Sequence, residues 1–352
     1  MEPGQLLGDR YRLDERVDGG GMGDVWRGRD TRLDRTVAIK VLHAGLSGDT
    51  TFRQRFHGEA RAVAALQAPG VVNLFDYGED TASNTGVVSY LVMEFVDGKS
   101  LRHLLSERET LPVDEVLDIV AQSADALDSA HQSGIVHRDV KPGNILIKPN
   151  TGQVKIVDFG IARARGASSL TETGTIMGSV SYVSPEQLYG QELTGASDVY
   201  SLGIVAYECL AGVKPFPGDV PATIISEQLH KTPDPLPAVV PAAVAETIMR
   251  ALEKDPANRW ASAAEFAAAC RGLQSTGPIK ASEVDPDATA IVPTGDPEAK
   301  TTILNTPDDA KTTTLAASNA AAAGSAKATD RGETNTKPER PAPPSPPPVR
   351  RD

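Results

Sequence analysis

The spacing of apolar and polar positions changes character about a quarter of the way along the chain. Before residue 97, apolar or alternating runs separated by Gly, Asp and Asn predict strands at 11–17, 23–30, 36–42, 71–80 and 87–96. One helix, over 49–67, interrupts them, because Phe52, Phe56 and Val63 recur at roughly helical spacing behind an N-cap residue. This part of the chain is therefore predicted to be a small, strand-rich lobe.

Helical periodicity dominates from Ser100 onward, most clearly over 113–132 and 197–212. The chain is thus predicted to be an α+β protein, in which a small antiparallel lobe (1–96) joins a larger, mostly helical lobe (97–275). Clefts between two such lobes are favoured sites for ligands.

Composition changes after residue 275. The segment 276–352 contains no Phe, Trp or Tyr and is rich in Thr and Pro, ending in KPERPAPPSPPPVRRD. Such a segment cannot bury enough apolar surface to form a core. We expect it to be a disordered tail.

Charge and cysteine content narrow the class of partners. A net charge of −12 argues against a nucleic-acid partner. The two cysteines, Cys209 and Cys270, lie in apolar surroundings and indicate a reducing cytosol. We find no signal peptide and no apolar run long enough to cross a membrane, which predicts a cytoplasmic protein. The basic ending PPVRRD would suit attachment to a membrane only if the sequence were part of a longer chain.

A glycine-rich segment, VDGGGMGDV (17–25), joins two predicted antiparallel strands. Gly20, Gly21 and Gly23 suit a loop that holds nucleotide phosphates, although a glycine-rich hairpin turn has the same pattern. Asp18 occupies the position where the pattern G-x-G-x-x-G-x-V has its first glycine.

Two charged residues accompany this loop. The apolar strand VAIK ends in Lys40, and the predicted helix supplies Glu59. A lysine that contacts phosphates needs a carboxylate to fix its flexible stem, whereas the alternative is an ordinary surface ion pair.

The segment IVHRDVKPGNILI places a polar turn between two apolar runs. Its spacing lets Asp139 accept a hydroxyl proton while Asn144 holds Mg²⁺, and Lys141 lies between them to neutralise the transferred group. A further apolar strand ends in Asp158, a second oxygen ligand of the kind that Mg²⁺ prefers.

Together, VAIK, Glu59, HRDVKPGN, DFG and SPE resemble the signature set of protein kinases, over residues 10–272. The segments HRDVKPGNIL, DFGIAR and YVSPEQ are most similar to eukaryote-like bacterial serine/threonine kinases of the actinobacterial type. The resemblance implies the bilobal protein kinase fold, with one regulatory helix on the small β-sheet lobe. It also implies ATP and Mg²⁺ as cofactors, with Mn²⁺ as an alternative ion, and Ser and Thr of protein substrates as phosphate acceptors.

The resemblance assigns roles to individual residues. Asp139 is the catalytic base and Lys141 the γ-phosphate partner; Asn144 and Asp158 are metal ligands. The ATP-binding residues are Val17, Gly20, Gly21, Gly23, Val25, Ala38, Lys40, Glu59, Met93 as gatekeeper, Glu94 and Val96 in the hinge, and Leu146. The structural supports are Asp198, which braces the catalytic loop, and a pair between Glu186 and Arg259.

Two positions depart from the family pattern. Ser179 replaces the usual threonine but keeps a hydroxyl that would bridge Asp139 and Lys141. The charge of Asp18 near ATP is expected to repel the nucleotide, so Asp18→Gly should lower the apparent Michaelis constant for ATP.

Regulation is expected in the hydroxyl-rich segment between Asp158 and Glu186. A phosphate there would pair with Arg138, next to the base, and order the segment. Resemblance to related bacterial kinases selects Thr171 and Thr173 as autophosphorylation sites, the alternative being a plain Thr-rich loop.

The tail carries an imperfect repeat, 289–300 and 301–311. Thr306 is followed three residues later by Asp309, which resembles the phosphothreonine motif read by forkhead-associated domains. We therefore expect a forkhead-associated partner, unless the tail is an inert linker. The resemblance also implies a back-to-back homodimer through the small lobe.

Two other functions compete with a protein kinase. The first is a catalytically silent pseudokinase scaffold that presents phosphothreonine motifs. The second, a small-molecule kinase of similar fold, is disfavoured by the segment from SPE to SDVYSLG, which resembles a peptide-binding platform.

Overall fold

The computed structural model describes residues 1–20, 23–43, 47, 50–66, 68–81, 87–159 and 180–274. The chain divides into two compact units, Met1–Glu283 and Val284–Asp352, and all described residues belong to the first. No helix among these residues is long and apolar enough to cross a membrane.

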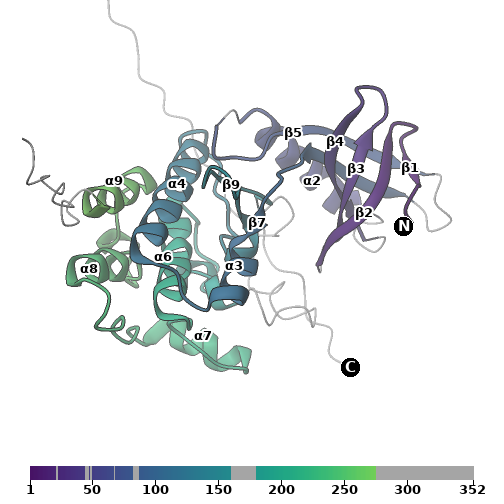
Figure 1. Ribbon diagram of the computed structural model, residues 1–352. Coiled ribbons are helices and arrows are strands. Elements are labelled where there is room, and N and C mark those ends of the chain that lie inside the picture. Colours follow the sequence, from purple (N-terminus) through teal and green to yellow (C-terminus); the bar gives the residue numbers. More distant parts are fainter. Residues whose placement is uncertain are drawn as a thin grey trace, which may run out of the picture. The chain divides into compact units, whose positions relative to one another are not determined.

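The N-terminal part is an antiparallel sheet of six strands in the order β1-β2-β3-β4-β6-β5 (Figure 1). Its strands are β1 (Leu6–Leu7), β2 (Tyr11–Gly20), β3 (Gly23–Asp30), β4 (Arg35–Leu42), β5 (Leu74–Asp80) and β6 (Val88–Glu94). One helix, α2 (Thr50–Ala64), contacts β5. The predicted strand-rich lobe is therefore confirmed, with α2 as the predicted helix, and the glycine-rich segment joins β2 to β3.

The two faces of β4 have different neighbours. Val37, Ile39 and Val41 are buried in one apolar cluster of the sheet. Side chains alternate along a strand, so Ala38 and Lys40 share the opposite face. Ala38 packs there against a second apolar cluster that contains Met93. The alternation thus gives Lys40 the face that carries the candidate nucleotide site.

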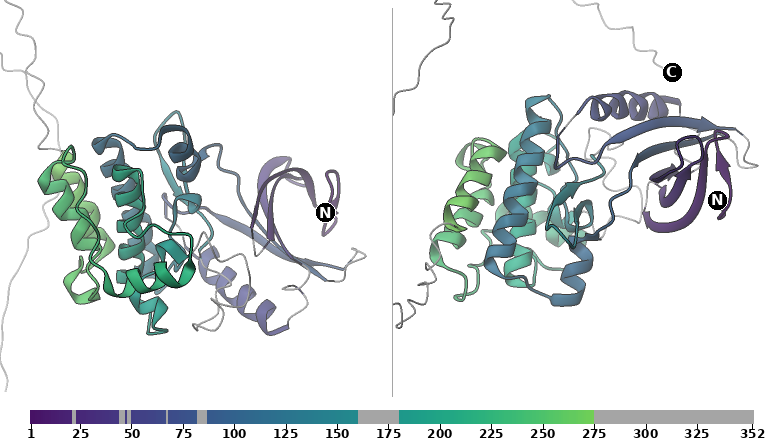
Figure 2. Two further views of the ribbon diagram at one scale, coloured as in Figure 1. Left: turned by 90° about the horizontal axis from the view of Figure 1, so that it is seen from below. Right: turned by 45° about the horizontal axis from the view of Figure 1, so that its top comes forward.

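The C-terminal part is mainly helical. Its helices are α3 (Leu101–Arg108), α4 (Val113–Gln132), α5 (Pro185–Leu188), α6 (Gly195–Ala211), α7 (Pro221–His230), α8 (Ala242–Ala251) and α9 (Ala263–Gln274), with short 3-10 turns η1 (Pro142–Asn144), η4 (Val180–Tyr182) and η5 (Pro256–Asn258). The long helix α4 packs against α6 and α9, as Figures 1 and 2 show. Buried side chains of all three helices contribute to the main core.

A small sheet joins the two parts of the fold. It has the order β7-β8-β9, with β7 (Lys99–Ser100), β8 (Ile145–Ile147) and β9 (Val154–Ile156). The Ile156 amide donates to the Gly70 carbonyl oxygen at 2.7 Å, and the Val72 amide donates to the Ile156 carbonyl oxygen at 3.0 Å. Residues just before β5 are therefore held against β9.

This pairing explains the main difference from the predicted elements. The apolar run 71–80 was expected to be one strand, but β5 begins only at Leu74. Val71 and Val72 are apolar because they are buried where the chain meets β9. Most other boundaries agree closely, and helix α4 coincides with the predicted 113–132.

A buried ion pair anchors α5 to the C-terminal helices. The Arg259 guanidinium donates to both carboxylate oxygens of Glu186, at 2.8 and 2.9 Å, and both side chains are buried. Its other hydrogen bonds go to the backbone carbonyls of Ala196, Glu253 and Lys254. Burial alone would raise the pKa of Glu186, but Arg259 and the Ser197 hydroxyl hold this pKa below its ordinary value. The predicted pair of Glu186 and Arg259 is confirmed.

We predict that Arg259→Met lowers the free energy of unfolding by about 3–5 kcal/mol, because it leaves the Glu186 carboxylate buried and unpaired. Urea denaturation at pH 7 measures the change. The matched control is Arg108→Met, which breaks the exposed pair with Glu115 and should cost less than about 1 kcal/mol.

The loss of unfolding free energy in Arg259→Met should also depend on pH. Because the folded pKa of Glu186 lies below its unfolded value, its contribution to stability is complete above the unfolded pKa and disappears as pH falls through the folded pKa. The difference in unfolding free energy between wild type and Arg259→Met should therefore become smaller in acid. An equal gap at neutral and acidic pH would contradict the assignment.

Candidate active site

The predicted base, Asp139, lies in a network formed by its own loop. The Lys141 ammonium contacts Asp139 Oδ2 at 2.7 Å. The Asn144 side-chain amide donates to the Asp139 carbonyl oxygen at 2.8 Å and to Asp139 Oδ2 at 3.2 Å. Two neighbours in sequence thus orient the carboxylate.

Asp198 of α6 holds the backbone of this loop. The buried Asp198 carboxylate accepts hydrogen bonds from the backbone amides of His137 at 2.8 Å and Arg138 at 2.9 Å. It also contacts the His131 ring at 2.7 Å. Arg138 has a φ of +66°, an unusual angle for a residue with a side chain, and these bonds stabilise it. The expected bracing role of Asp198 is present.

His137 links the loop to the residues that directly follow β9. It is fully buried, and its Nδ1 accepts the Asp139 amide hydrogen at 3.2 Å. Its Nε2 therefore carries the proton and donates to the Val157 carbonyl oxygen at 2.9 Å. Its ring also packs on Phe159, with centroids 4.6 Å apart. We assigned this histidine no role from the sequence, because its partners are backbone groups.

Strand register brings Asn144 near Asp158. In the antiparallel pair of β8 and β9, Ile145 lies opposite Ile156. The next hydrogen bond runs from the Val157 amide to the Asn144 carbonyl oxygen at 3.0 Å. Asp158, with a φ of +56°, follows directly. The two predicted metal ligands therefore lie at the same end of this ribbon.

Lys40 reaches across to Asp158 from β4, with its ammonium 2.9 Å from Asp158 Oδ2. Burial alone would raise the pKa of Asp158, but the charge and hydrogen bond of Lys40 hold this pKa below its ordinary value. From the sequence we expected Glu59 as the partner of Lys40. Glu59 belongs to α2, but its side chain lies outside the described residues.

The donor groups fit a divalent cation. The Asn144 side-chain nitrogen is turned to Asp139, which leaves its amide oxygen as the donor for a metal. The depressed pKa of Asp158 keeps a second oxygen donor charged. An amide oxygen and a carboxylate suit Mg²⁺, which completes its coordination with waters and substrate phosphates.

Four of the predicted adenine-pocket residues come together. Met93 and Val96 belong to one buried apolar cluster, and Ala38 and Leu146 pack against it. They come from β4, β6, the segment after β6, and β8. The cluster therefore joins both lobes.

Glu94, in the predicted hinge, is occupied by structural contacts. Its carboxylate is 3.0 Å from the Lys155 ammonium and accepts from the Asn73 side chain at 2.9 Å. Its amide donates to the Asn73 carbonyl oxygen at 2.8 Å. Neither group is oriented for a ligand, so only the carbonyl oxygen of Glu94 suits the hinge role. The buried Lys155 is a second support, which no sequence motif indicates.

The remaining predicted residues lie in several places. Gly20 and Gly23 face each other at the ends of β2 and β3, Val25 is half-buried and Val17 is exposed. Those outside the described residues are Gly21, Thr171, Thr173 and Ser179.

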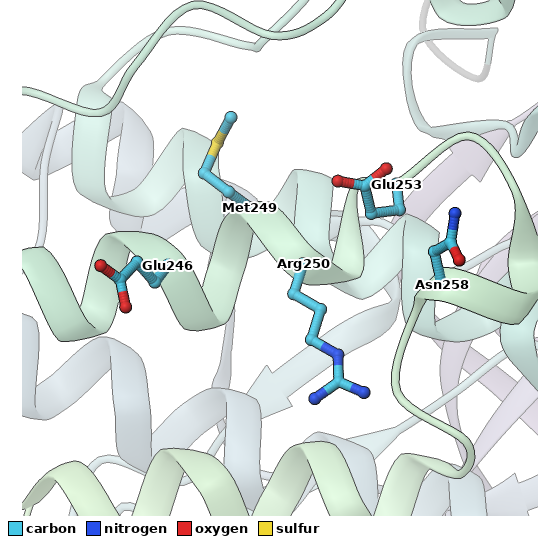
Figure 3. Close-up of a pocket in the computed structure, with 5 residues that line it drawn as sticks. All are labelled: Glu246, Met249, Arg250, Glu253 and Asn258. Carbon is cyan, nitrogen blue, oxygen red and sulfur yellow. The ribbon is translucent and has the colours of Figure 1, made fainter.

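A surface hollow on the helical part is distinct from these residues. It is lined by Glu246, Met249, Arg250, Glu253 and Asn258 (Figure 3). Arg250 stacks on the Trp260 ring at 4.1 Å, which accounts for its position. The hollow shares no residue with the predicted site.

One carboxylate is oriented by a lysine and an asparagine, and a second, which also feels the charge of that lysine, is paired with a strand lysine. This is the arrangement expected of a phosphotransfer centre of the protein kinase class. Residues 11–269 match the protein kinase domain family, and the chain belongs to this family. Membership implies the use of ATP and a divalent metal ion.

Curated relatives show which kind of protein kinase the chain is. The chain is 45% identical over 296 residues to serine/threonine-protein kinase PknA of Mycobacterium tuberculosis, covering 83% of this chain and 68% of the relative. It is 42% identical over 288 residues to serine/threonine-protein kinase PknB of Mycobacterium leprae, covering 80% of this chain and 46% of that relative. The chain is thus a bacterial, eukaryote-like serine/threonine protein kinase, and its substrates are proteins. Nothing in these relationships favours the silent scaffold.

Solved structures agree with the fold. The PknI kinase domain of Mycobacterium tuberculosis superposes with a TM-score of 0.60 at 29% identity, covering 78% of this chain and 99% of that one. A mutant of the same domain with a single substitution gives a TM-score of 0.61, with the same identity and coverage. The predicted bilobal kinase fold is confirmed.

We predict that Asp198→Asn lowers kcat about 10- to 100-fold with little change in KM for ATP, because the loop that carries the base loses its charged anchor. Steady-state phosphorylation of a generic protein substrate measures both constants. Asp118→Asn, an exposed acid on α4, is the control and should leave both unchanged. A pure KM effect would contradict a positioning role for Asp198.

Proposed function

We propose that Asp139 accepts the proton of a substrate Ser or Thr hydroxyl as the hydroxyl oxygen bonds to the γ-phosphorus of ATP, whose bond to the β-phosphate oxygen breaks to release ADP. The observation that carries this proposal is the network in which Lys141 and Asn144 orient the Asp139 carboxylate. Lys141 neutralises charge on the transferred group, and Lys40 contacts the α- and β-phosphates.

Asn144 and Asp158 would hold the metal ion, Mg²⁺ or alternatively Mn²⁺. When bound, the ion neutralises charge on the phosphate oxygens. Glu59 completes the phosphate clamp with Lys40. The adenine would lie between Val17, Val25, Ala38 and Leu146, with Met93 as gatekeeper and the Glu94 carbonyl and Val96 amide as its polar contacts.

Autophosphorylation of Thr171 and Thr173 would control the site. A phosphate on this segment gains a charge-assisted pair with Arg138. The position of Arg138 supports this role, since its amide is bonded to Asp198 and its carbonyl oxygen accepts from Gln187 at 3.2 Å. A phosphate there would therefore act directly on the loop that carries the base.

The segment 276–352 would be a separate Thr/Pro-rich tail after a kinase domain of residues 1–275. Phosphorylated Thr306, with Asp309 three residues later, would recruit a forkhead-associated domain. The kinase would act in signal transduction through such a partner in the cytoplasm. The two free, buried cysteines support this location, because the cytoplasm is reducing.

The small lobe would also form a back-to-back homodimer. Leu33, between β3 and β4, is 59% exposed, and the exposed Phe75 stacks under Arg35 at 3.9 Å. Exposed apolar side chains suit a symmetric contact, in which the same patch of two copies meets.

Phosphosite mapping of the full chain after incubation with ATP and Mg²⁺ tests the catalytic proposal. Phosphate should appear in the wild type at Thr171, Thr173 and Thr306. Loss of the base in Asp139→Asn should reduce it at least about 100-fold. No phosphate in the wild type would favour the scaffold instead, and phosphate that spares Thr306 would refute the tail proposal alone.

The double variant Thr171→Ala with Thr173→Ala should lose most of its activity toward an added substrate, since the phosphate contact of Arg138 is then lost. A phosphorylation assay on a generic protein substrate measures it. Thr289→Ala with Thr301→Ala, in the tail, is the control. Equal activity of wild type and Thr171/Thr173 variant would refute their regulatory role.

Sedimentation velocity tests the homodimer. Leu33→Glu should shift the wild-type dimer toward monomer, because the substitution puts two like charges at a symmetric contact. Val239→Glu, at a site 86% exposed on the helical part, is the control. A wild type that stays monomeric at high concentration rules the dimer out.

A further inference from the structure

An ion pair connects the two strands of the β2–β3 hairpin, which carries the glycine-rich segment. Arg16 on β2 and Asp24 on β3 form an ion pair at 2.7 Å. Gly19 lies beneath it, where a Cβ would overlap the Arg16 guanidinium. This cross-strand pair ties β2 to β3 near the glycine-rich segment.

Asp18, next to Gly19, uses its two carboxylate oxygens differently. Oδ1 accepts the Gly19 amide hydrogen at 2.8 Å, within the hairpin. Oδ2 faces the helical part of the fold, 3.8 Å from the Arg102 guanidinium. Asp18 therefore connects the hairpin to the other lobe.

Arg102 is the second residue of α3, which begins after Ser100 caps it through the His103 amide. A cation in the first turn of a helix is unfavourable for the helix dipole, so helix stability does not explain this arginine. Its guanidinium lies against the catalytic loop, 3.6 Å from where a Cβ of Gly143 would be. Gly143 lies between Lys141 and Asn144. Arg102 thus spans from the catalytic loop to the glycine-rich hairpin.

We propose that Asp18 and Arg102 form a positioning pair, which holds the glycine-rich hairpin against the helical lobe and slows the release of nucleotide. The pair rests on the nucleotide site proposed above. It accounts for an acid at the first glycine position of the pattern, since glycine there has no side chain to reach Arg102. It also reverses the expectation that Asp18 merely repels ATP.

The expected effect is modest, because the Asp18 and Arg102 side chains are 62% and 69% exposed. Exposed ion pairs change an equilibrium by up to about fivefold and weaken with salt. The effect should therefore be clear at low ionic strength and small at high ionic strength.

Release of a fluorescent ADP analogue from the full chain, followed by stopped flow, tests the pair. Asp18→Asn keeps an oxygen for the Gly19 amide but removes the charge, and Arg102→Met keeps most of the apolar stem. At low salt each should speed release about two- to fivefold, and the double variant should release no faster than the single ones. The KM for ATP should rise by a similar factor, with kcat within about twofold of wild type.

Two further variants separate the pair from general effects of charge. Arg108→Met removes another arginine of α3, whose partner Glu115 belongs to the same lobe, and should leave release unchanged. Exchanging the charges, as Asp18→Lys with Arg102→Glu, should restore part of the slow release.

Slower release or a lower KM in Asp18→Asn would overturn the proposal in favour of simple repulsion, and so would additive effects in the double variant. Nucleotide release is measured without phosphate transfer. A chain that binds ADP and follows these rates but labels no protein would contradict the proposed catalytic function and leave the pair intact.

Discussion

The catalytic loop depends on one buried carboxylate. Asp198 accepts the backbone amides of His137 and Arg138 and contacts the His131 ring, so backbone and imidazole groups compensate its charge. Backbone donors cannot rotate away as side chains can, so the loop acquires a defined path that includes the strained Arg138. The position of Asp139 follows from the path of this backbone, because Asp139 comes directly after Arg138. A helix of the core thus determines where the proposed base lies.

The second constraint is the meeting of the two lobes at β9. Backbone pairing of Ile156 with Gly70 and Val72 holds the small lobe against β9, two residues before Asp158. The ion pair between Lys155 on β9 and Glu94 at the end of β6 adds a side-chain contact between the same two parts. These contacts bring Asp158 within reach of Lys40. At a separate contact between the lobes, the proposed pair of Asp18 and Arg102 would slow nucleotide release.

Much of this site follows from local sequence. Asp139, Lys141 and Asn144 are close in the chain and meet in one turn, so their spacing alone indicates their contacts. The pair of Glu186 and Arg259 came from family resemblance, since nothing local links the two. The contact of Lys40 with Asp158 was not anticipated, because it depends on how a β4 side chain and the end of β9 are brought together. The role of His137 was missed because backbone groups leave no pattern in the sequence.

By itself, the sequence determined most strands of the small lobe and helices α2, α4 and α6. It also determined the division into a strand-rich and a helical lobe and the kinase class. Periodicity and short motifs carry that information, because they act over a few residues. Only the tertiary structure decided which charges meet. It placed Asp18 beside Arg102, because an ion pair depends on distances between side chains that are remote in the chain and that folding alone brings together.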